Sequence, residues 1–175
     1  MNHRRIFSEE RKAHDLAQAQ NLVGKKLAAL SNVQYYFESE KVTDDIGDIE
    51  WQCTDGSTVA MFLLTNGESV GADTLPADIP QAFELEEGER CSWQTVDLLS
   101  SLAANYLVGK KIVSVQAFVD YHINYNYQIL SGFKVLFESG DFIFYYNCGD
   151  DGFALLNQLP SPNEGIKSEL LESLQ

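Results

Sequence analysis

The chain has 175 residues, a hydrophobic fraction of 45% and a net charge of −14. This length accommodates one ordinary domain or two small ones, and the apolar content is sufficient to build a core. The excess of 26 acidic over 12 basic residues argues against binding to nucleic acids or to anionic membranes, because both depend on Lys and Arg. It favours a basic protein partner, or serves solubility alone.

The N-terminus and the cysteines predict a cytoplasmic protein. Charged residues stand at positions 9–12, where a secretory signal would be apolar, and no apolar run reaches the roughly 18 residues of a membrane helix. Cys53, Cys91 and Cys148 are odd in number and contain no CxxC pair. This pattern suits a reducing compartment better than a disulfide scaffold.

The first half of the chain, residues 1–70, is predicted to be a helix followed by strands. Ser8 is a suitable cap for a helix that continues to about Gln20. A long strand is expected over residues 27–37, and Asp55-Gly56 predicts a tight turn between two further strands, because Gly accepts a positive φ. Residues 71–91 contain two prolines and are predicted to form an acidic linker with at most one helical turn.

The second half, residues 92–157, follows the same order. Residues 107–112 (Leu-Val-Gly-Lys-Lys-Ile) match residues 22–27 (Leu-Val-Gly-Lys-Lys-Leu) at an offset of 85 residues. A helix capped by Ser92 or Thr95 is expected before this segment. Ser139-Gly140 then corresponds to the tight turn of the first half, and the turn at residues 150–152 corresponds to the one at residues 65–67.

The tail, residues 158–175, is predicted to end in a short helix. Ile166, Leu170 and Leu174 lie four residues apart, which places them on one helical face. With this C-terminal helix docked on the body, the expected fold class is α+β. It consists of two tandem pseudo-symmetric helix-plus-antiparallel-sheet repeats that form one compact unit.

The Gly-Lys-Lys segments allow two interpretations. Glycine followed by lysines can bind phosphate, but phosphate loops lie at helix N-termini. Gly24 and Gly109 instead follow the predicted helices. We therefore interpret both as left-handed residues that end a helix, with the lysines complementing the negative end of the helix dipole.

The negative charge is concentrated in the middle of the chain. Residues 42–109 contain 13 acidic residues and one basic residue, Arg90. Two clusters make up most of this excess: Asp44, Asp45, Asp48 and Glu50 in the first half, and Glu84, Glu86, Glu87 and Glu89 in the linker. They are interpreted either as solvated loops or as a face that docks a basic protein, where charge speeds association and sets specificity. The first cluster lacks the ligand spacing of a calcium loop.

Residues 121–127 (Tyr-His-Ile-Asn-Tyr-Asn-Tyr) are the second candidate surface. Alternating Tyr and Asn is typical of adaptable protein contacts, so Tyr121 and Tyr125 are candidate partner-binding residues. The alternative is a strand that packs one row of aromatic side chains against the sheet. Stacking of single-stranded nucleic acid on these rings would need a positive groove, and the lysines of this half are too few to form one.

The sequence contains few groups suited to catalysis. His122 has Asp120 two residues away, on the same face of a strand, and Cys148 is the candidate nucleophile for such a pair. No local signature supports a Cys-His site, and the chain has no P-loop, HExxH, GxSxG or GxGxxG motif. We therefore expect a protein that is not an enzyme and that binds no cofactor or metal.

Three features carry a family resemblance: the repeated Leu-Val-Gly-Lys-Lys unit, the segment at residues 136–143 (Leu-Phe-Glu-Ser-Gly-Asp-Phe-Ile) and the acidic turn at residues 150–152. With them the chain resembles the small cytoplasmic immunity proteins that accompany bacterial polymorphic and contact-dependent inhibition toxins. The resemblance implies binding to a toxin domain, often a basic nuclease, and blocking of its active site. The chain also resembles the duplicated layout of Whirly-type domains, but its acidity opposes their single-stranded DNA binding.

The leading hypothesis is therefore an immunity protein that binds and neutralises a basic, nuclease-type toxin domain through its acidic residues. The alternative is a non-catalytic scaffold module that binds a protein or a small ligand between the two halves. Neither a nucleic acid nor a membrane is expected as a partner, and the sequence leaves the oligomeric state open.

Overall fold

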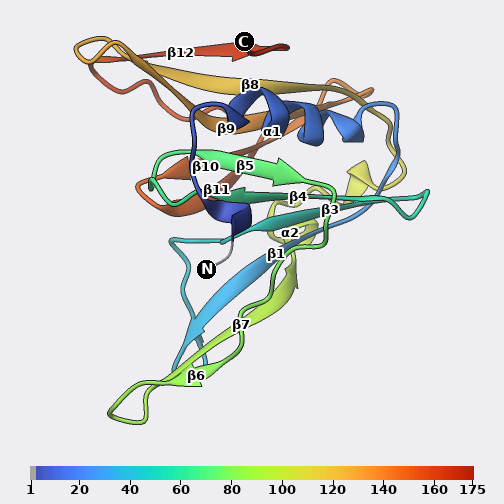
Figure 1. The fold of residues 1–175 in the computed structure, drawn as a ribbon. Helices are drawn as coiled ribbons and strands as arrows, with labels where there is room; N and C mark the ends of the chain where they lie inside the picture. Colours follow the sequence, from blue (N-terminus) through green and yellow to red (C-terminus); the bar gives the residue numbers. More distant parts are fainter. Residues whose placement is uncertain (1–2) are drawn as a thin grey trace.

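In the computed structural model, which describes residues 3–175, the chain forms two antiparallel sheets that stack on each other (Figure 1). The first sheet contains β1 (Leu27–Phe37), β2 (Glu40–Lys41), β3 (Ile49–Cys53), β4 (Thr58–Leu63), β5 (Val70–Asp73), β6 (Phe83–Glu84) and β7 (Arg90–Asp97). The second contains β8 (Ile112–His122), β9 (Tyr127–Phe137), β10 (Phe142–Cys148), β11 (Asp151–Leu156) and β12 (Ile166–Leu171). The helices are α1 (Arg11–Ala19) and α2 (Leu98–Ser101), with short 3-10 segments η1 (His3–Arg5), η2 (Gln20–Leu22) and η3 (Asn105–Leu107). The predicted α+β class with antiparallel sheets is confirmed.

The strand orders of the two sheets are alike. The first sheet runs β5-β4-β3-β1-β7-β6, with β2 paired to the end of β1, and the second runs β11-β10-β9-β8-β12. Each sheet is organised around a long strand, β1 or β8, and these two strands have the same sequence of buried and exposed positions. On one side, each long strand pairs with a strand that comes much later in the chain, β7 or β12.

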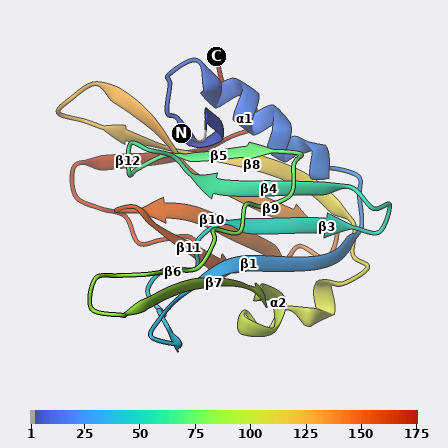
Figure 2. The same cartoon turned by 60° about the horizontal axis from the view of Figure 1, so that its bottom comes forward.

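Apolar side chains from both sheets fill the space between them. One cluster of buried residues combines side chains of β3 and β4 with those of β8, β9 and β10. The ring centroids of Trp51 in the first sheet and Phe137 in the second are 6.4 Å apart. α1 covers the side of this core next to β5 (Figure 2) and contributes Leu16 and Ala19. Both sheets therefore share one core, and its burial is the main stabilising contribution.

The two Gly-Lys-Lys segments lie next to each other and join the sheets. The N–H of Gly24 donates to the carbonyl oxygen of Ile112 at 2.8 Å, and the N–H of Gly109 donates to that of Leu27 at 2.7 Å. The second lysines of the two segments form an antiparallel bridge. Gly24 has a φ of 85° and Gly109 a φ of 82°. These left-handed values confirm the prediction that both glycines end a helical segment.

The first helix begins later than predicted. α1 starts at Arg11, and its N-cap residue makes no side-chain capping bond, so Ser8 is not the cap. The residues before α1 instead run along the outer face of the first sheet, where Phe7 packs on a small apolar cluster that contains Phe62. The guanidinium of Arg11 donates to backbone carbonyl groups of this N-terminal segment. Tertiary contacts, and not a cap, thus position the start of the helix.

The second helix is much shorter than predicted. Ser92 and Thr95, the expected caps, lie inside β7 and pair with β1. α2 is a single turn capped by Asp97, and a left-handed φ of 55° at Ala103 follows it. The prediction is wrong because residues 90–97 include Trp, Thr and Val, which favour a strand once a partner strand is available.

The predicted C-terminal helix is wrong. Residues 166–171 form β12, which pairs with β8 from Ile166 opposite His122 to Leu171 opposite Ala117. Residues four apart share a face in a strand as well as in a helix, so the spacing of Ile166 and Leu170 was compatible with both. The strand forms because β8 would otherwise be an edge strand with unpaired N–H and C=O groups, and pairing with residues 166–171 satisfies these groups.

The acidic linker, residues 71–91, contains more regular structure than predicted. It includes most of β5, all of β6 and the first residues of β7. Residues 85–89 form the tight turn of the β6–β7 hairpin and not a helical turn. The stretch from 74 to 82, which holds Pro76 and Pro80, has neither helix nor strand, as expected of prolines four residues apart.

Candidate protein-binding surface

The first acidic cluster, residues 44–50, is part of the folded framework. Asp48 is buried and forms an ion pair with Arg5 of the N-terminal segment, whose Nη1 lies 2.9 Å from Oδ1 of the carboxylate. Burial raises the pKa of Asp48, and the hydrogen bonds from Arg5 act in the opposite direction. A carboxylate held in this way stabilises the fold and is not presented to a partner.

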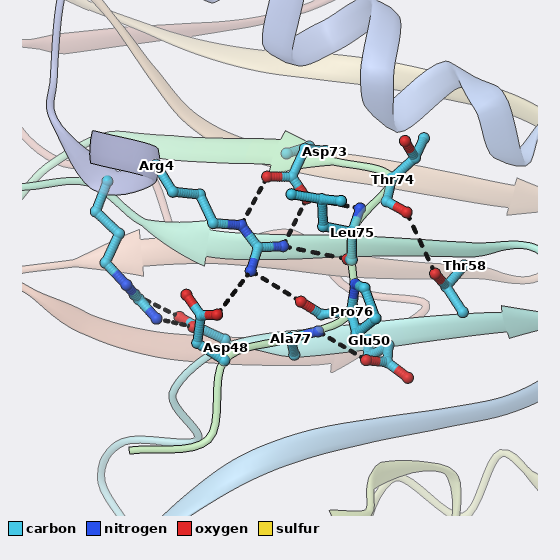
Figure 3. Close-up of polar contacts among 12 residues, drawn as sticks. Arg4, Asp48, Glu50, Thr58, Asp73, Thr74, Leu75, Pro76 and Ala77 are labelled. Carbon is cyan, nitrogen blue, oxygen red and sulfur yellow. Dashed lines mark hydrogen bonds and ion pairs between the residues drawn. The ribbon is translucent and has the colours of Figure 1, made fainter. Parts of the chain in front are cut away.

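Two further side chains of this cluster also accept hydrogen bonds from backbone N–H groups of the protein. Oε2 of Glu50 accepts a hydrogen bond from the N–H of Ala77 at 2.7 Å (Figure 3). Oδ1 of Asp45 accepts one from the N–H of Gly152 at 2.8 Å, which joins a loop of the first half to β11. Asp44 is the exposed member of the cluster. Charge reversal at the other three would therefore disturb folding as much as binding.

The segment before α1, residues 3–10, which we call the N-terminal strap, is held on the first sheet by Arg4 as well as by Arg5 (Figure 3). Arg4 and Asp73 form a two-pronged ion pair, with Nε–Oδ2 at 2.6 Å and Nη2–Oδ1 at 2.5 Å. Arg4 also donates to the carbonyl oxygen of Pro76 at 2.8 Å, and its guanidinium carbon lies 4.8 Å from the ring centroid of Phe62. Asp73 and Pro76 are 69 and 72 residues away from Arg4 in sequence. No local pattern could therefore have identified them.

The second acidic cluster lies on a projecting hairpin. Residues 83–91, which we call the acidic arm, form β6, a tight turn and the start of β7, at the end of the first sheet that points away from the second (Figure 1). Glu84, Glu86 and Glu87 are exposed and Glu89 is half-buried. Within residues 3–175, none of the four forms an ion pair. Arg90 is the basic residue of the arm, so the arm is strongly negative.

Apolar side chains accompany these charges on the arm. Phe83 is 49% exposed and Leu85 is 44% exposed. At the base of the arm, Trp93 packs between Phe83 and Tyr35, with ring centroids 5.8 Å and 5.1 Å away. The hydroxyl of Tyr35 donates to Sγ of Cys91 at 3.2 Å, which raises the pKa of Tyr35. Aromatic anchors within a charged rim are typical of protein–protein interfaces.

A shallow cavity of about 330 Å³ continues this surface at the base of the arm. Val33, Leu63 and Trp93 form apolar parts of its lining, and Pro80 contributes to it from the irregular stretch before β6. The rest of the lining is mostly charged: Arg5, Asp45, Asp48 and Asp78. A concave surface with apolar and charged walls, beside the exposed ring of Phe83, is suited to accept a protruding side chain. The arm and this cavity together form the candidate protein-binding surface.

The Tyr-Asn segment lies elsewhere and is not a continuous strand. β8 ends at His122 and β9 begins at Tyr127, so residues 123–126 are the turn of a hairpin. Tyr121 packs against the core, whereas Tyr125 is 75% exposed. The hairpin belongs to the second sheet and lies on the opposite side of the stacked sheets from the acidic arm (Figure 1). The structure therefore does not bring Tyr121 and Tyr125 together with the acidic clusters.

The residues considered for catalysis do not share a site. Cys148 and Asp120 line the same cavity, but the hydrogen bond of Asp120 comes from Ser168. His122 instead stacks on Tyr127, with ring centroids 4.7 Å apart. Among residues 3–175, no group of three His, Cys, Asp or Glu side chains is placed to hold a metal ion.

Sequence reasoning missed the aromatic base of the arm. The register of β1 and β7 places Tyr35 opposite Trp93, and that of β6 and β7 places Phe83 opposite Cys91. The aromatic run at residues 35–37, at the end of a predicted strand and next to acidic residues, could have indicated a contact surface there. What the sequence lacked was the identity of the partner strand.

No model of a protein family, no curated protein and no solved structure matches this chain. Across residues 3–175, no helix has both the length and the apolar character that crossing a membrane requires.

Proposed function

We propose that the chain is a cytoplasmic immunity protein that binds a basic, nuclease-type toxin domain and blocks its active site, with the acidic arm as its docking element. The observation that carries this proposal is the arm itself, where glutamates without ion-pair partners surround exposed Phe83 and Leu85. A nuclease needs a basic cleft to bind phosphates, so carboxylates on a protruding hairpin are complementary to it in charge. The sequence resemblance supports the same class of partner.

The charged and apolar parts of the arm have different roles in this proposal. The exposed carboxylates attract the partner over a distance of about 10 Å at 0.1 M salt and thereby raise the association rate. Phe83, Leu85 and the cavity beside Trp93 supply the buried contacts that slow dissociation. Salt should therefore change mainly the association rate, and truncation of the apolar anchors mainly the dissociation rate.

The test combines partner capture with a charge reversal. The wild-type chain is used to capture its partner from the source cell, and a toxin domain with a basic cleft is the expected result. The triple variant Glu84→Lys, Glu86→Lys and Glu87→Lys should then associate with this partner at least about tenfold more slowly at low salt, and the difference should shrink as salt is added.

A matched control keeps the net charge change identical. Glu10, Glu164 and Glu172 are exposed and lie around α1 and β12, away from the arm (Figure 1). Their reversal to Lys should leave the association rate within about twofold of the wild type. If the arm variant associates and protects cells as well as the wild type, the arm is not the docking element. If both variants lose binding equally, net charge and not the arm is responsible.

We also infer that the two halves are pseudo-symmetric repeats of one unit. Support comes from the like strand orders of the sheets, from the matched burial of β1 and β8, and from the reciprocal hydrogen bonds of Gly24 and Gly109. In such a pair β7 and β12 occupy corresponding places. The acidic arm is then an addition to the first repeat, because the second sheet has no strand that corresponds to β6 among the described residues. A crystal structure whose halves fail to superpose strand by strand would refute this inference.

A further inference from the structure

A cavity of about 210 Å³ lies on the outer face of the second sheet, far from the acidic arm. Strands β8, β9, β10 and β12 all contribute to it, and part of its wall is the loop that leads to β12. The side chains that matter for its chemistry are those of Phe118, Asp120, Ser131, Tyr146, Cys148 and Ser168. The cavity is not between the two halves, where Trp51 and Phe137 fill the space.

The shape of the cavity follows from one glycine and one irregular position in the sheet. Gly132 lies opposite Phe118 in β8 and opposite Tyr146 in β10. A Cβ on Gly132 would lie 2.8 Å from the ring of Phe144, so the missing side chain makes room for that ring. The pairing register between β8 and β9 shifts beside this position and leaves Ser131 unpaired. Such bulges re-aim side chains, often next to binding sites.

Aromatic rings line up across this face of the sheet. The ring centroids of Phe118 and Phe144 are 4.8 Å apart, and those of Phe144 and Tyr146 are 5.2 Å apart. Phe118 is 8% exposed and Phe144 is fully buried, so the row is a firmly packed wall. Rigid aromatic walls hold the alkyl part of a ligand and attract a cation.

The charge of the cavity is negative and is not compensated. Asp120 is the charged side chain among the residues that line it, and it is half-buried. Within residues 3–175, Asp120 forms no ion pair. Lys167, next to its strand partner Ser168, pairs with Glu169 instead. A partly desolvated carboxylate without a cation is unfavourable, and a bound cation would remove that cost.

Three of the polar side chains around the cavity donate hydrogen bonds within the protein. The hydroxyl of Ser168 donates to Asp120, and that of Ser131 donates to the carbonyl oxygen of Phe118 at 3.4 Å. The amide nitrogen of Asn147 donates to the carbonyl oxygen of Ser69 at 3.0 Å. The oxygen atoms of Asp120, Ser131 and Ser168 keep lone pairs that can accept hydrogen bonds from a ligand.

We propose that this cavity binds an organic cation, an ammonium or guanidinium group on a short apolar stem, with Asp120 as its counter-ion and the wall of Phe118 and Tyr146 against the stem. An anion is excluded by the charge of Asp120, and a purely apolar ligand would leave that carboxylate uncompensated. The cation belongs either to a free small amine or to a Lys or Arg side chain of a protein. The proposal uses a different surface from the acidic arm and stands whether or not the arm docks a toxin.

The test compares cations with a neutral molecule of the same shape. Choline and butylamine represent free amines, and blocked derivatives of Lys and Arg, acetylated and N-methyl-amidated, represent protein side chains. 3,3-Dimethylbutanol is the neutral counterpart of choline. Binding is measured by NMR titration and by protection of Cys148, which is exposed and lines the cavity, from alkylation. The cations should bind and protect, and the neutral alcohol should bind at least about tenfold more weakly.

The variant Asp120→Asn tests the counter-ion directly. It should weaken cation binding about tenfold to a hundredfold, whereas Asp44→Asn, an equal charge change at an exposed site, should not change it. Thermal unfolding shows whether each variant is folded, and the wild-type comparison of cation with alcohol needs no variant. Equal binding of choline and the alcohol, unchanged binding by Asp120→Asn, or no protection of Cys148 by any cation would overturn the proposal. Tighter binding of the blocked amino acids identifies a protein side chain as the ligand, and tighter binding of the small amines identifies a free amine.

Discussion

The ion pair between Arg11 and Asp15 should contribute far more to stability than an exposed ion pair elsewhere in the fold. The side chain of Asp15 is 1% exposed and accepts hydrogen bonds from Nε of Arg11 at 2.7 Å and from Nη2 at 3.0 Å. The same carboxylate accepts from the N–H of Ala72 at 3.2 Å, which joins α1 to β5. Arg11 in turn holds the N-terminal strap through the carbonyl oxygens of Arg4 and Ile6.

The expected magnitude follows from burial and from the groups left behind. Two charges 4 Å apart attract each other by about 4 kcal/mol at an effective dielectric constant of 20, and their desolvation offsets part of this. Asp15→Ala would leave the N–H of Ala72 without its acceptor and Arg11, only 18% exposed, without its counter-ion. We expect it to lower the free energy of unfolding by about 3–5 kcal/mol. The coupling between Arg11 and Asp15 should be about 2 kcal/mol.

Urea unfolding of the wild type, Arg11→Met, Asp15→Ala and the double variant measures this coupling. The pair of Lys167 and Glu169 is the control, because its side chains are 68% and 37% exposed and exposed pairs contribute about 1 kcal/mol or less. A coupling for the buried pair no larger than that of the control would refute the reasoning. It would mean that burial does not strengthen this contact.

Four further outcomes can be checked directly. Asp97→Ala should lower the free energy of unfolding by about 1 kcal/mol because it removes the cap of α2. Hydrogen bonds from Ser100 lower the pKa of Asp97 in the folded state. The contribution of Asp97 to the free energy of unfolding is therefore present above its unfolded-state pKa and is lost as pH falls through the lower folded-state pKa. Urea unfolding of Asp97→Asn across that pH range should lack this loss. Gly132→Ala should cost more than about 2 kcal/mol in thermal unfolding, because the new Cβ would lie 2.6 Å from the backbone oxygen of Tyr145, and equal stability would contradict the packing. Mass spectrometry of the alkylated native protein should find one modified thiol, Cys148, because the other two cysteines are buried.

Features with a local physical cause were predictable from the sequence. Gly24 and Gly109 end helical segments because glycine adopts the left-handed conformation at little cost. Asp55-Gly56 and Ser139-Gly140 mark the turns between β3 and β4 and between β9 and β10. Each of these predictions depends on a few neighbouring residues, so no knowledge of the tertiary contacts was needed.

The candidate surfaces depended on contacts that the sequence does not reveal. The charge clusters at residues 44–50 and 84–89 look equivalent along the chain, yet one is tied to Arg5 and to backbone N–H groups whereas the other is exposed. Ile166 and Leu170 fit a helix and a strand equally well until the edge of β8 is known.

The sequence by itself determined the composition, the charge excess and the places where the chain turns. Only the tertiary structure decided which carboxylates face solvent, and it joined Phe118, Asp120, Tyr146 and Ser168 into one cavity. The physical reason is the distance along the chain over which each interaction acts. Turn and cap preferences act over a few residues, whereas ion pairs, strand pairing and cavities join positions tens of residues apart, whose proximity only folding creates.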